Sequence, residues 1–432
     1  QELIDRNCCV DPSIPYYNPN TNETVYIDNT NMPSNDWLIS PRVGFNYDVK
    51  GDDTFQLRGG SGLFTGRFPF VWLGNQIANP NSYFLTAVDP DYKYPQVWRT
   101  NIGTDYRLEN GVILTGDVSY TKDINGAHVQ NWGLQNPTGT LNAPGDNRPV
   151  YNPSDVGNSA YMFTNSDKGR IWNVALKAQK TFKDGLYTMF AYSYLNAKDV
   201  NSIEAEITSD AFDFNPTSGD ANKDVLSYSK YGDTHRFIGV ASKKWTYGND
   251  KWSSTLSTFF EYAKGGRFNY TYAGNINNDS SFQNNDLIYI PTSAQVQQMT
   301  LSGGSTMAND FENFIQQDDY LSDNRGNYAE RYGALAPWRG RWDLKFLQDY
   351  NFKVGEKTNT IQFSLDVLNV GNLISSDWGV LEQPKNLSPL GVDTSGSVPV
   401  YTFNGGPDAE TFGYDSSLAS RWQAQFGLRY IF

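Results

Sequence analysis

The last twelve residues, Arg421 to Phe432, place the tightest constraint on the fold of this chain, because they alternate strictly between two kinds of side chain. Successive side chains of a β-strand point to opposite faces, so a strand here has one aromatic, apolar face and one polar face. A strand of a soluble sandwich can alternate in the same way, but an aromatic last residue is typical of the closing strand of an outer-membrane barrel. The expected apolar face consists of Trp422, Ala424, Phe426, Leu428, Tyr430 and Phe432.

The composition also favours a membrane barrel over a soluble acidic protein. Aromatic residues make up 15% of the chain, with 28 Tyr, 25 Phe and 11 Trp, and barrels place such a surplus in girdles at the two membrane interfaces. The mean hydropathy is -0.57 and no run of about 20 apolar residues occurs, so no membrane-spanning helix is predicted. The net charge of -13 argues against nucleic acid as a partner.

Residues suited to catalysis or metal binding are scarce. The chain has two Cys, Cys8 and Cys9, and two His, His128 and His235. Neighbouring cysteines rarely bridge each other, and no second pair is present for a zinc site, so we interpret them as an incidental pair. We therefore predict neither an enzyme nor a cofactor.

Alternation with a period of two predicts eleven strands, and the connections between them alternate without exception between short and long. Outer-membrane barrels have this asymmetry, with tight turns on the periplasmic side and long loops outside. The predicted fold class is therefore all-β, a transmembrane antiparallel β-barrel. The strands are expected near 38–49, 54–66, 95–108, 111–127, 168–182, 186–199, 234–248, 251–266, 339–354, 358–372 and 419–432. The short, turn-rich connections are 50–53, 109–110, 183–185, 248–250 and 355–357.

The register of the strands follows from the cost of placing charge in lipid. In the segment 341–354, Trp342 and Phe346 fall on one face, and Lys345 and Asp349 fall on the other. The opposite register would bring Lys345 near the bilayer midplane, where a Lys costs about 2–4 kcal/mol. We therefore predict that the charged face lines the lumen. The lipid-facing side chains are expected to include Trp342, Phe346, Phe426, Tyr430 and Phe432.

The strand count predicts that this chain is only part of a barrel, because single-chain bacterial barrels have an even number of strands. If Phe432 ends on the side of the short turns, residues 1–37 form an extracellular loop segment, and residues 38–432 form the C-terminal part of the barrel. Doubling eleven strands gives the 22 strands of plugged outer-membrane transporters. The remaining strands and the plug are then expected as partners from outside this sequence.

The segments 40–48 (SPRVGFNYD) and 56–67 (QLRGGSGLFTGR) resemble the Oar-like branch of TonB-dependent receptors of Bacteroidota, which usually carry an N-terminal carboxypeptidase-regulatory-like domain. Further similarity lies in 70–72, 75–76, 285–291 and the closing segment. The resemblance implies a 22-stranded barrel with a plug and a TonB box, energised through TonB, ExbB and ExbD. The plug, the TonB box and the regulatory domain are not visible here, so active transport is implied by the resemblance alone.

One polar segment has the spacing of a calcium loop. Asn275, Asn277, Asp279 and Asp286 fall at positions 1, 3, 5 and 12 of that spacing. Ser280 stands where the sharp turn needs Gly, and Asp286 stands where a bidentate Glu binds best. We therefore expect a solvated polar loop here, with calcium as the less favoured alternative.

The long connection after Arg67 is rich in aromatic residues, which provide large contact areas at little entropic cost. These rings can stack on a ligand, or they can fold the loop onto its neighbours. The substrate-contact candidates in this connection are Phe68, Phe70, Trp72, Asn75, Gln76, Tyr92 and Tyr94.

These patterns and the resemblance together predict a plugged barrel in the bacterial outer membrane that takes up a scarce solute, such as a carbohydrate, a peptide or a chelate. Lipid and lipopolysaccharide are expected around the barrel, and a surface lipoprotein is a further expected partner. Two alternatives remain open, namely a structural or adhesive surface barrel that binds partner proteins, and a passive porin. A plug and a TonB box upstream would favour the transporter.

Overall fold

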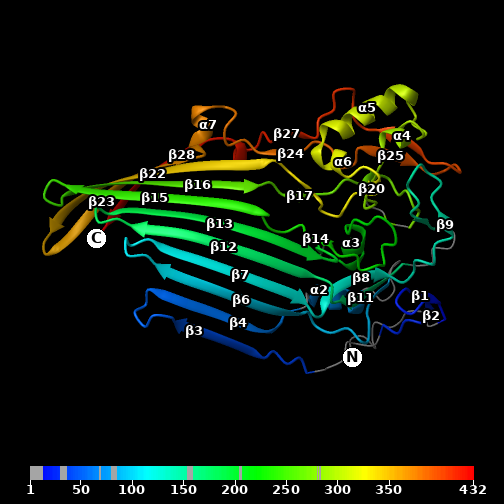
Figure 1. Cartoon of the computed structure of the whole chain (residues 1–432), viewed down its shortest axis with the longest axis horizontal. Coiled ribbons are helices and arrows are strands. Elements are labelled where there is room, and N and C mark those ends of the chain that lie inside the picture. The colour runs from blue at the N-terminus through cyan, green and yellow to red at the C-terminus, as the bar shows by residue number, and fades with distance from the viewer. Residues whose placement is uncertain are drawn as a thin grey trace.

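The computed structural model of the chain is dominated by one antiparallel sheet whose main path contains eleven strands in sequence order (Figure 1). The structure describes residues 13–29, 37–67, 70–78, 85–152, 159–203, 207–279, 281 and 284–432, except for the side chains of Phe70, Asn75, Ile77 and Ala78. The strands are β3 (Arg42–Asp48), β4 (Phe55–Thr65), β6 (Gln96–Arg107), β7 (Ile113–Asp123), β12 (Arg170–Thr181), β13 (Leu186–Asp199), β15 (His235–Tyr247), β16 (Trp252–Lys264), β22 (Trp338–Val354), β23 (Lys357–Leu368) and β28 (Gln423–Ile431).

All eleven predicted strands are present, which confirms the all-β fold class and the order of the strands. Four boundaries were wrong by four residues: the strand predicted from residue 38 begins at Arg42, the one predicted to reach residue 127 ends at Asp123, and two more differ near the C-terminus. The strand predicted to reach residue 372 ends at Leu368, because Asn369 adopts a left-handed φ of 52° and α7 (Val370–Ile374) begins directly after it. The strand predicted from residue 419 begins at Gln423, after the short 3-10 helix η1 (Leu418–Ser420).

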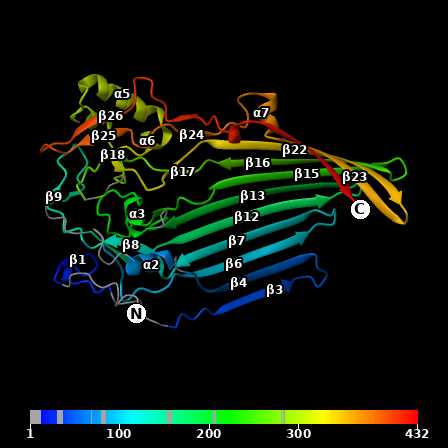
Figure 2. The same ribbon diagram turned by 180° about the vertical axis from the view of Figure 1, so that it is seen from behind.

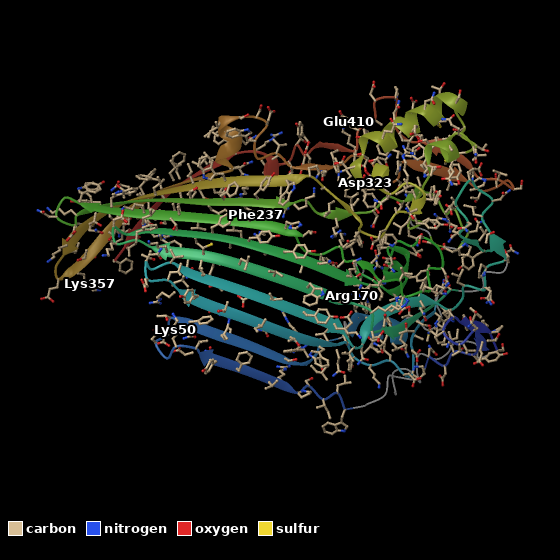
Figure 3. The ribbon with its side chains drawn as sticks, in the orientation of Figure 1. Lys50, Arg170, Phe237, Asp323, Lys357 and Glu410 are labelled. Carbon is tan, nitrogen blue, oxygen red and sulfur yellow. The ribbon has the colours of Figure 1, made fainter. Side chains whose placement is uncertain are left out.

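The five short connections all lie at one end of the sheet, as predicted. Lys50 and Lys357 mark this end in Figure 3, whereas Asp323 and Glu410 mark the region of the long connections. Glycine allows these tight turns, because it adopts positive φ without a steric cost. Gly51 has a φ of 72° and Gly185 a φ of 82°, and Gly355 has a φ of 65°.

The register of the strands separates the side chains into two faces. Trp342 lies opposite Phe260, and Phe346 lies opposite Leu365, which in turn lies opposite Phe426. Residues that pair directly across an antiparallel sheet project from the same face. Trp342, Phe346, Phe426 and Tyr430 therefore share one face, as predicted, and we call it the apolar face. Its rings are open to the surroundings, with Phe426 69% exposed and Phe432, beyond the last strand, 84% exposed.

The sheet has two free edges among the described residues. β3 pairs only with β4, and β28 pairs only with β23. The eleven strands therefore form an open sheet within this chain, and the short strand β14 (Ser227–Tyr228) pairs with the end of β13 without extending the edge.

The long connections fold into a compact region with cores of its own, which we call the loop layer (Figure 2). The helix α5 (Gly304–Gln317) shows why the region folds, because Ala308, Phe311, Phe314 and Ile315 recur at helical spacing and are buried. The first two connections contain α2 (Phe70–Ala78), β5 (Leu85–Val88), β8 (Gly126–Asn131), β9 (Gly139–Thr140), β10 (Pro149–Val150) and β11 (Ala160–Ser166). The third contains α3 (Thr208–Asp213) and β14.

The two remaining connections supply most of the helices of the loop layer. The fourth contains β17 (Arg267–Phe268), β18 (Tyr272–Ala273), β19 (Tyr289–Ile290), α4 (Ser293–Val296), α5, α6 (Asp319–Asp323), β20 (Asn327–Tyr328) and β21 (Ala334–Leu335). The fifth contains α7, β24 (Glu382–Pro384), β25 (Leu390–Asp393), β26 (Val400–Phe403), β27 (Phe412–Tyr414) and η1. None of the helices in the described part of the chain has the length and apolar character needed to cross a membrane.

The segment before the first long strand packs into the loop layer. The hairpin of β1 (Tyr16–Asn18) and β2 (Glu23–Val25) joins it through Tyr17, whose backbone N–H donates to the carbonyl of Trp132 at 2.8 Å. Tyr16 and Ile27 are buried in the same small core as Trp132. The extracellular position of residues 1–37 remains a prediction, and Cys8 and Cys9 lie outside the described residues.

Candidate functional site: the loop layer and the polar face of the sheet

The aromatic candidates after Arg67 fold this connection onto its neighbours. Trp72 is 3% exposed and stacks on Phe163, with ring centroids 4.7 Å apart. Tyr92 is 2% exposed and meets the edge of the same ring. Gln76 is also buried, and its side-chain amide donates to the carbonyl of Asn29 at 2.7 Å. These contacts explain why the connection is ordered around Phe163.

The other substrate-contact candidates differ in their surroundings. Tyr94 is 38% exposed, far more than Trp72, Gln76 or Tyr92. The backbone of Phe70 and Asn75 lies in α2, and Phe68 lies outside the described residues. Ligand contact by these residues remains a prediction, and among the described candidates Tyr94 is the best placed for it.

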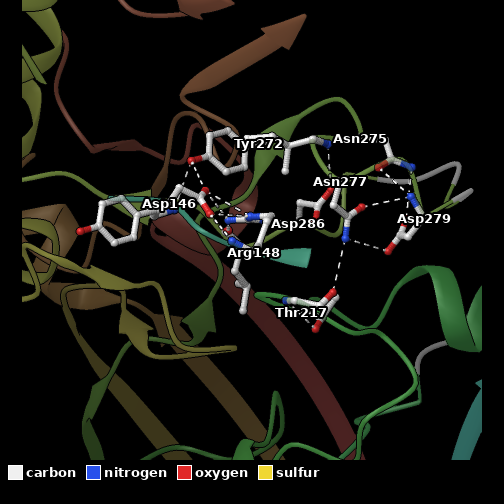
Figure 4. A network of polar contacts seen from close by, with 12 residues as sticks. Asp146, Arg148, Thr217, Tyr272, Asn275, Asn277, Asp279 and Asp286 are labelled. Atoms are coloured by element: carbon white, nitrogen blue, oxygen red, sulfur yellow. Dashed lines mark hydrogen bonds and ion pairs between the residues drawn. The ribbon is translucent and has the colours of Figure 1, made fainter. Parts of the chain in front are cut away.

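The centre of the loop layer contains an ion-pair network that the sequence did not reveal (Figure 4). The guanidinium of Arg148 has no solvent exposure and pairs with Asp146 Oδ2 at 3.0 Å and with Asp286 Oδ1 at 3.1 Å. Its third contact is a hydrogen bond to the carbonyl of Leu287 at 2.7 Å. The ring centroids of Tyr272 and Tyr328 lie 5.1 and 5.2 Å from the guanidinium carbon of Arg148. A buried charge is tolerated only when it is paired and hydrogen-bonded in this way.

This network joins three connections that are far apart in the sequence. Arg148 comes from the connection between β7 and β12, and Asp286 comes from the one between β16 and β22. Thr217, from the connection between β13 and β15, accepts a backbone hydrogen bond from Leu287 at 2.8 Å. The network therefore fixes the relative positions of these three connections above the sheet.

The segment with calcium-loop spacing lies next to this network, and it is buried instead of solvated as we had expected. Asn277, Asp279 and Asp286 each have 0% exposure. The side-chain amides of Asn275 and Asn277 donate to Asp279, at 3.2 and 3.3 Å. Asp286 accepts from the backbone of Ile276 at 3.0 Å as well as from Arg148. The protein itself therefore supplies partners for these carboxylates.

Within the described residues, no three side chains of His, Cys, Asp or Glu are arranged to hold a metal ion. The charge around the segment is nevertheless unbalanced, because Asp213 lies near Asp279 and no cation among the described residues offsets its charge. Asp213 is 5% exposed, and its Oδ1 has no hydrogen-bond partner in the described structure. Burial, with Asp279 and Asp210 nearby, raises the pKa of Asp213 to about 7. A proton on Asp213 relieves the repulsion in this cluster.

The polar face of the sheet, opposite the apolar face, is lined with ion pairs that join different strands. Arg58 on β4 donates to Asp117 Oδ1 on β7 at 2.8 Å and also contacts Asp105 on β6. Lys345 on β22 pairs with Asp366 on β23 at 2.7 Å. These groups are partly exposed, so they present a charged wall to water and to any polar solute beside it.

Comparisons with known proteins find similarity in structure alone. No protein-family model matches the chain, and no curated protein matches it. Among solved structures, the outer membrane transporter YddB from Escherichia coli aligns with a TM-score of 0.48 and 11% identity, over 91% of this chain and 40% of that chain. A mutant of the ferric enterobactin receptor PfeA from Pseudomonas aeruginosa aligns with a TM-score of 0.42 and 9% identity, over 90% of this chain and 39% of that one. This chain therefore spans about 40% of the length of these two proteins.

Proposed function

We propose that this chain forms part of the barrel of a TonB-dependent receptor in the bacterial outer membrane, in the Oar-like branch. One observation carries the membrane-barrel part of the proposal, and the Oar-like branch rests on the resemblance of residues 40–48 and 56–67. An exposed apolar face runs along the eleven-stranded sheet, opposite a face of ion pairs, and the short turns all lie at one end. A soluble protein rarely exposes a contiguous apolar face that extends over many strands, whereas a membrane barrel needs one.

The free edges of the sheet support a role for further strands. An open sheet in lipid would leave the backbone groups of β3 and β28 unpaired, at a cost of several kcal/mol for each group. We propose that strands from outside these 432 residues pair with both edges and enclose a plug. TonB, with ExbB and ExbD, would then act through the plug.

The transported solute is proposed to be a scarce carbohydrate, peptide or chelate. The charged wall formed by Arg58, Asp105 and Asp117 supports a polar solute, because these groups face the interior of the proposed barrel. Tyr94 and the exposed parts of the loop layer would make the first contacts. A surface lipoprotein above the loops is a further proposed partner.

The test is uptake of labelled oligosaccharides, peptides and metal chelates by cells with and without the complete gene. We expect one class to accumulate in wild-type cells and to stop accumulating when either the gene or TonB is deleted. Uptake that needs the gene but not TonB would support a passive porin. Unchanged uptake together with lost binding of a partner protein at the surface would support the adhesive barrel.

A further inference from the structure

The apolar face contains a recess at the end of β22 that the transport proposal does not use. It has a volume of about 600 Å³, which lies within the usual range of ligand pockets, about 300–1,000 Å³. It lies beside the C-terminal end of β16 and the N-terminal end of β22, and residues of the segment after β23 line its other side. We call it the aromatic recess, and its rings are Phe260, Tyr262, Trp338, Trp342, Trp378 and Tyr414.

The aromatic recess exists because β22 extends beyond the end of β23, one of the two strands with which it pairs. Residues 338–343 of β22 pair with β16, but pairing with β23 starts only at Leu344. The chain leaves β23 at Asn369, whose backbone N–H donates to Asp343 at 2.8 Å. The segment 369–382 therefore passes beside the unpaired edge of β22 and forms the second wall.

The second wall is held in shape by its own hydrogen bonds. The side-chain amide of Asn369 donates to the carbonyl of Gly379 at 2.9 Å, and that of Asn372 donates to the carbonyl of Trp378 at 3.1 Å. Gly379 has a φ of 65°, and a Cβ there would lie 1.9 Å from Asn369 Oδ1. The Trp378 ring is thus presented by a preformed turn, although it is 56% exposed.

A second cavity of about 580 Å³ shares Trp338 with the aromatic recess. Its lining mixes the polar side chains of Lys264, Gln317, Asp319 and Asp323 with apolar ones such as Phe268, Leu335 and Phe412. We call it the polar recess. Carboxylate and amide groups accept hydrogen bonds from hydroxyl groups, and acidic side chains repel an anion. At the rim of the aromatic recess, Arg341 is neutralised by Asp343 at 2.9 Å.

We propose that the two recesses together bind one molecule of a neutral glycolipid, with an acyl chain in the aromatic recess and sugar hydroxyls in the polar recess. The inference rests on the membrane location given under Proposed function. The aromatic recess is continuous with the apolar face, so a lipid reaches it without leaving the bilayer. Trp338, which lines both cavities, marks the boundary between the acyl chain and the sugar head. Carboxylates outnumber cations in the lining of the two recesses, and this negative charge selects against a phosphate-bearing head.

The test uses the complete protein, extracted from membranes into an oxyethylene detergent that has no sugar head. Native mass spectrometry then counts the bound lipid during titration with diglucosyl diacylglycerol or with phosphatidylglycerol of the same chain length. We expect one diglucosyl diacylglycerol per protein, bound at least ~10-fold more tightly than phosphatidylglycerol. Equal binding of the two lipids would overturn the proposed headgroup selectivity.

Variants locate the lipid. Trp378→Ala is expected to weaken binding of the glycolipid about 10-fold, since a large part of the second wall is lost. Leu373→Ala is the matched control, because Leu373 is 50% exposed on α7 but does not line the recess. The double variant Asp319→Asn and Asp323→Asn is expected to reduce the ratio between the affinities for diglucosyl diacylglycerol and phosphatidylglycerol, because it removes two of the carboxylates that repel the phosphate. Unchanged binding by Trp378→Ala would refute the site.

The same samples separate failure of this inference from failure of the proposed function. Each variant should run as a heat-modifiable barrel in detergent, which shows that folding is intact. A folded barrel without the selective lipid would overturn the glycolipid site alone. A protein that is monodisperse without detergent would overturn the membrane location, and the glycolipid site with it.

Discussion

Arg148 Nη1 lies 3.1 Å from Asp286 Oδ1 in a fully buried pair whose members are 138 residues apart in the sequence and come from two different connections. Arg148→Met should therefore loosen the loop layer, because Asp146 and Asp286 lose their cation. Breaking a buried pair by removing one partner costs about 3–5 kcal/mol. Denaturant unfolding of the purified protein, followed by limited proteolysis of the loop layer, measures this loss.

The control for Arg148→Met is Lys385→Met, which breaks the exposed pair between Lys385 and Glu410. Exposed pairs contribute little to stability, so this variant should unfold like the wild type. Equal stability of both variants would show that the buried network does not hold the loop layer together.

The apolar face is tested by a pair of Arg substitutions on adjacent residues of β23. Leu365 lies between Phe346 and Phe426 on the apolar face, whereas Ser364 projects from the polar face. Leu365→Arg should destabilise the barrel by about 2–4 kcal/mol in lipid, and Ser364→Arg should change stability far less. Unfolding titrations in lipid vesicles measure the difference. A reversed order would mean that the faces are assigned the wrong way round.

The raised pKa of Asp213, about 7, makes the loop layer sensitive to pH. Between about pH 4 and pH 7 the folded state keeps a proton that the unfolded state has released, so this group's contribution to stability falls as the pH rises. Asp213→Asn should remove that part of the slope. Thermal unfolding from pH 4.5 to pH 7.5 measures it, with exposed Asp319→Asn as the control. The idea fails if the wild type and Asp213→Asn show parallel profiles.

The free edges at β3 and β28 predict how this chain behaves alone. Residues 1–432 refolded in detergent should give no stable monomeric barrel, because both edges would stay unpaired. Electrophoresis with and without heating detects a folded barrel by its shifted mobility. A heat-modifiable monomer from these residues alone would contradict the need for further strands.

The sheet was predictable from the sequence because its signal is local. Alternation at adjacent positions, as in Trp342 to Lys345, fixes both the strand and its faces, and turn residues such as Gly355 mark its end. The end of the strand at Leu368 and the start of α7 at Val370 were missed, because a single left-handed residue, Asn369, ends the alternating pattern.

The candidate site was less predictable, because it depends on contacts between distant parts of the chain. The spacing of Asn275, Asn277 and Asp279 drew attention to the right segment, but the segment is buried and hydrogen-bonded instead of solvated. Nothing near Arg148 in the sequence indicates that its partner is Asp286. Similarly, the aromatic residues after Arg67 have the same composition whether they bind a ligand or pack on Phe163.

Cysteine labelling of intact cells tests the central claim, that this sheet crosses the outer membrane with its long connections outside. In a Cys8→Ser, Cys9→Ser background, single cysteines replace Asp323 and Glu410 in the loop layer, and Lys50 and Lys357 at the short turns (Figure 3). A membrane-impermeant maleimide should label Asp323→Cys and Glu410→Cys on intact cells, and should label Lys50→Cys and Lys357→Cys only after the outer membrane is opened. Labelling of both groups on intact cells, or of the short turns alone, would contradict the account.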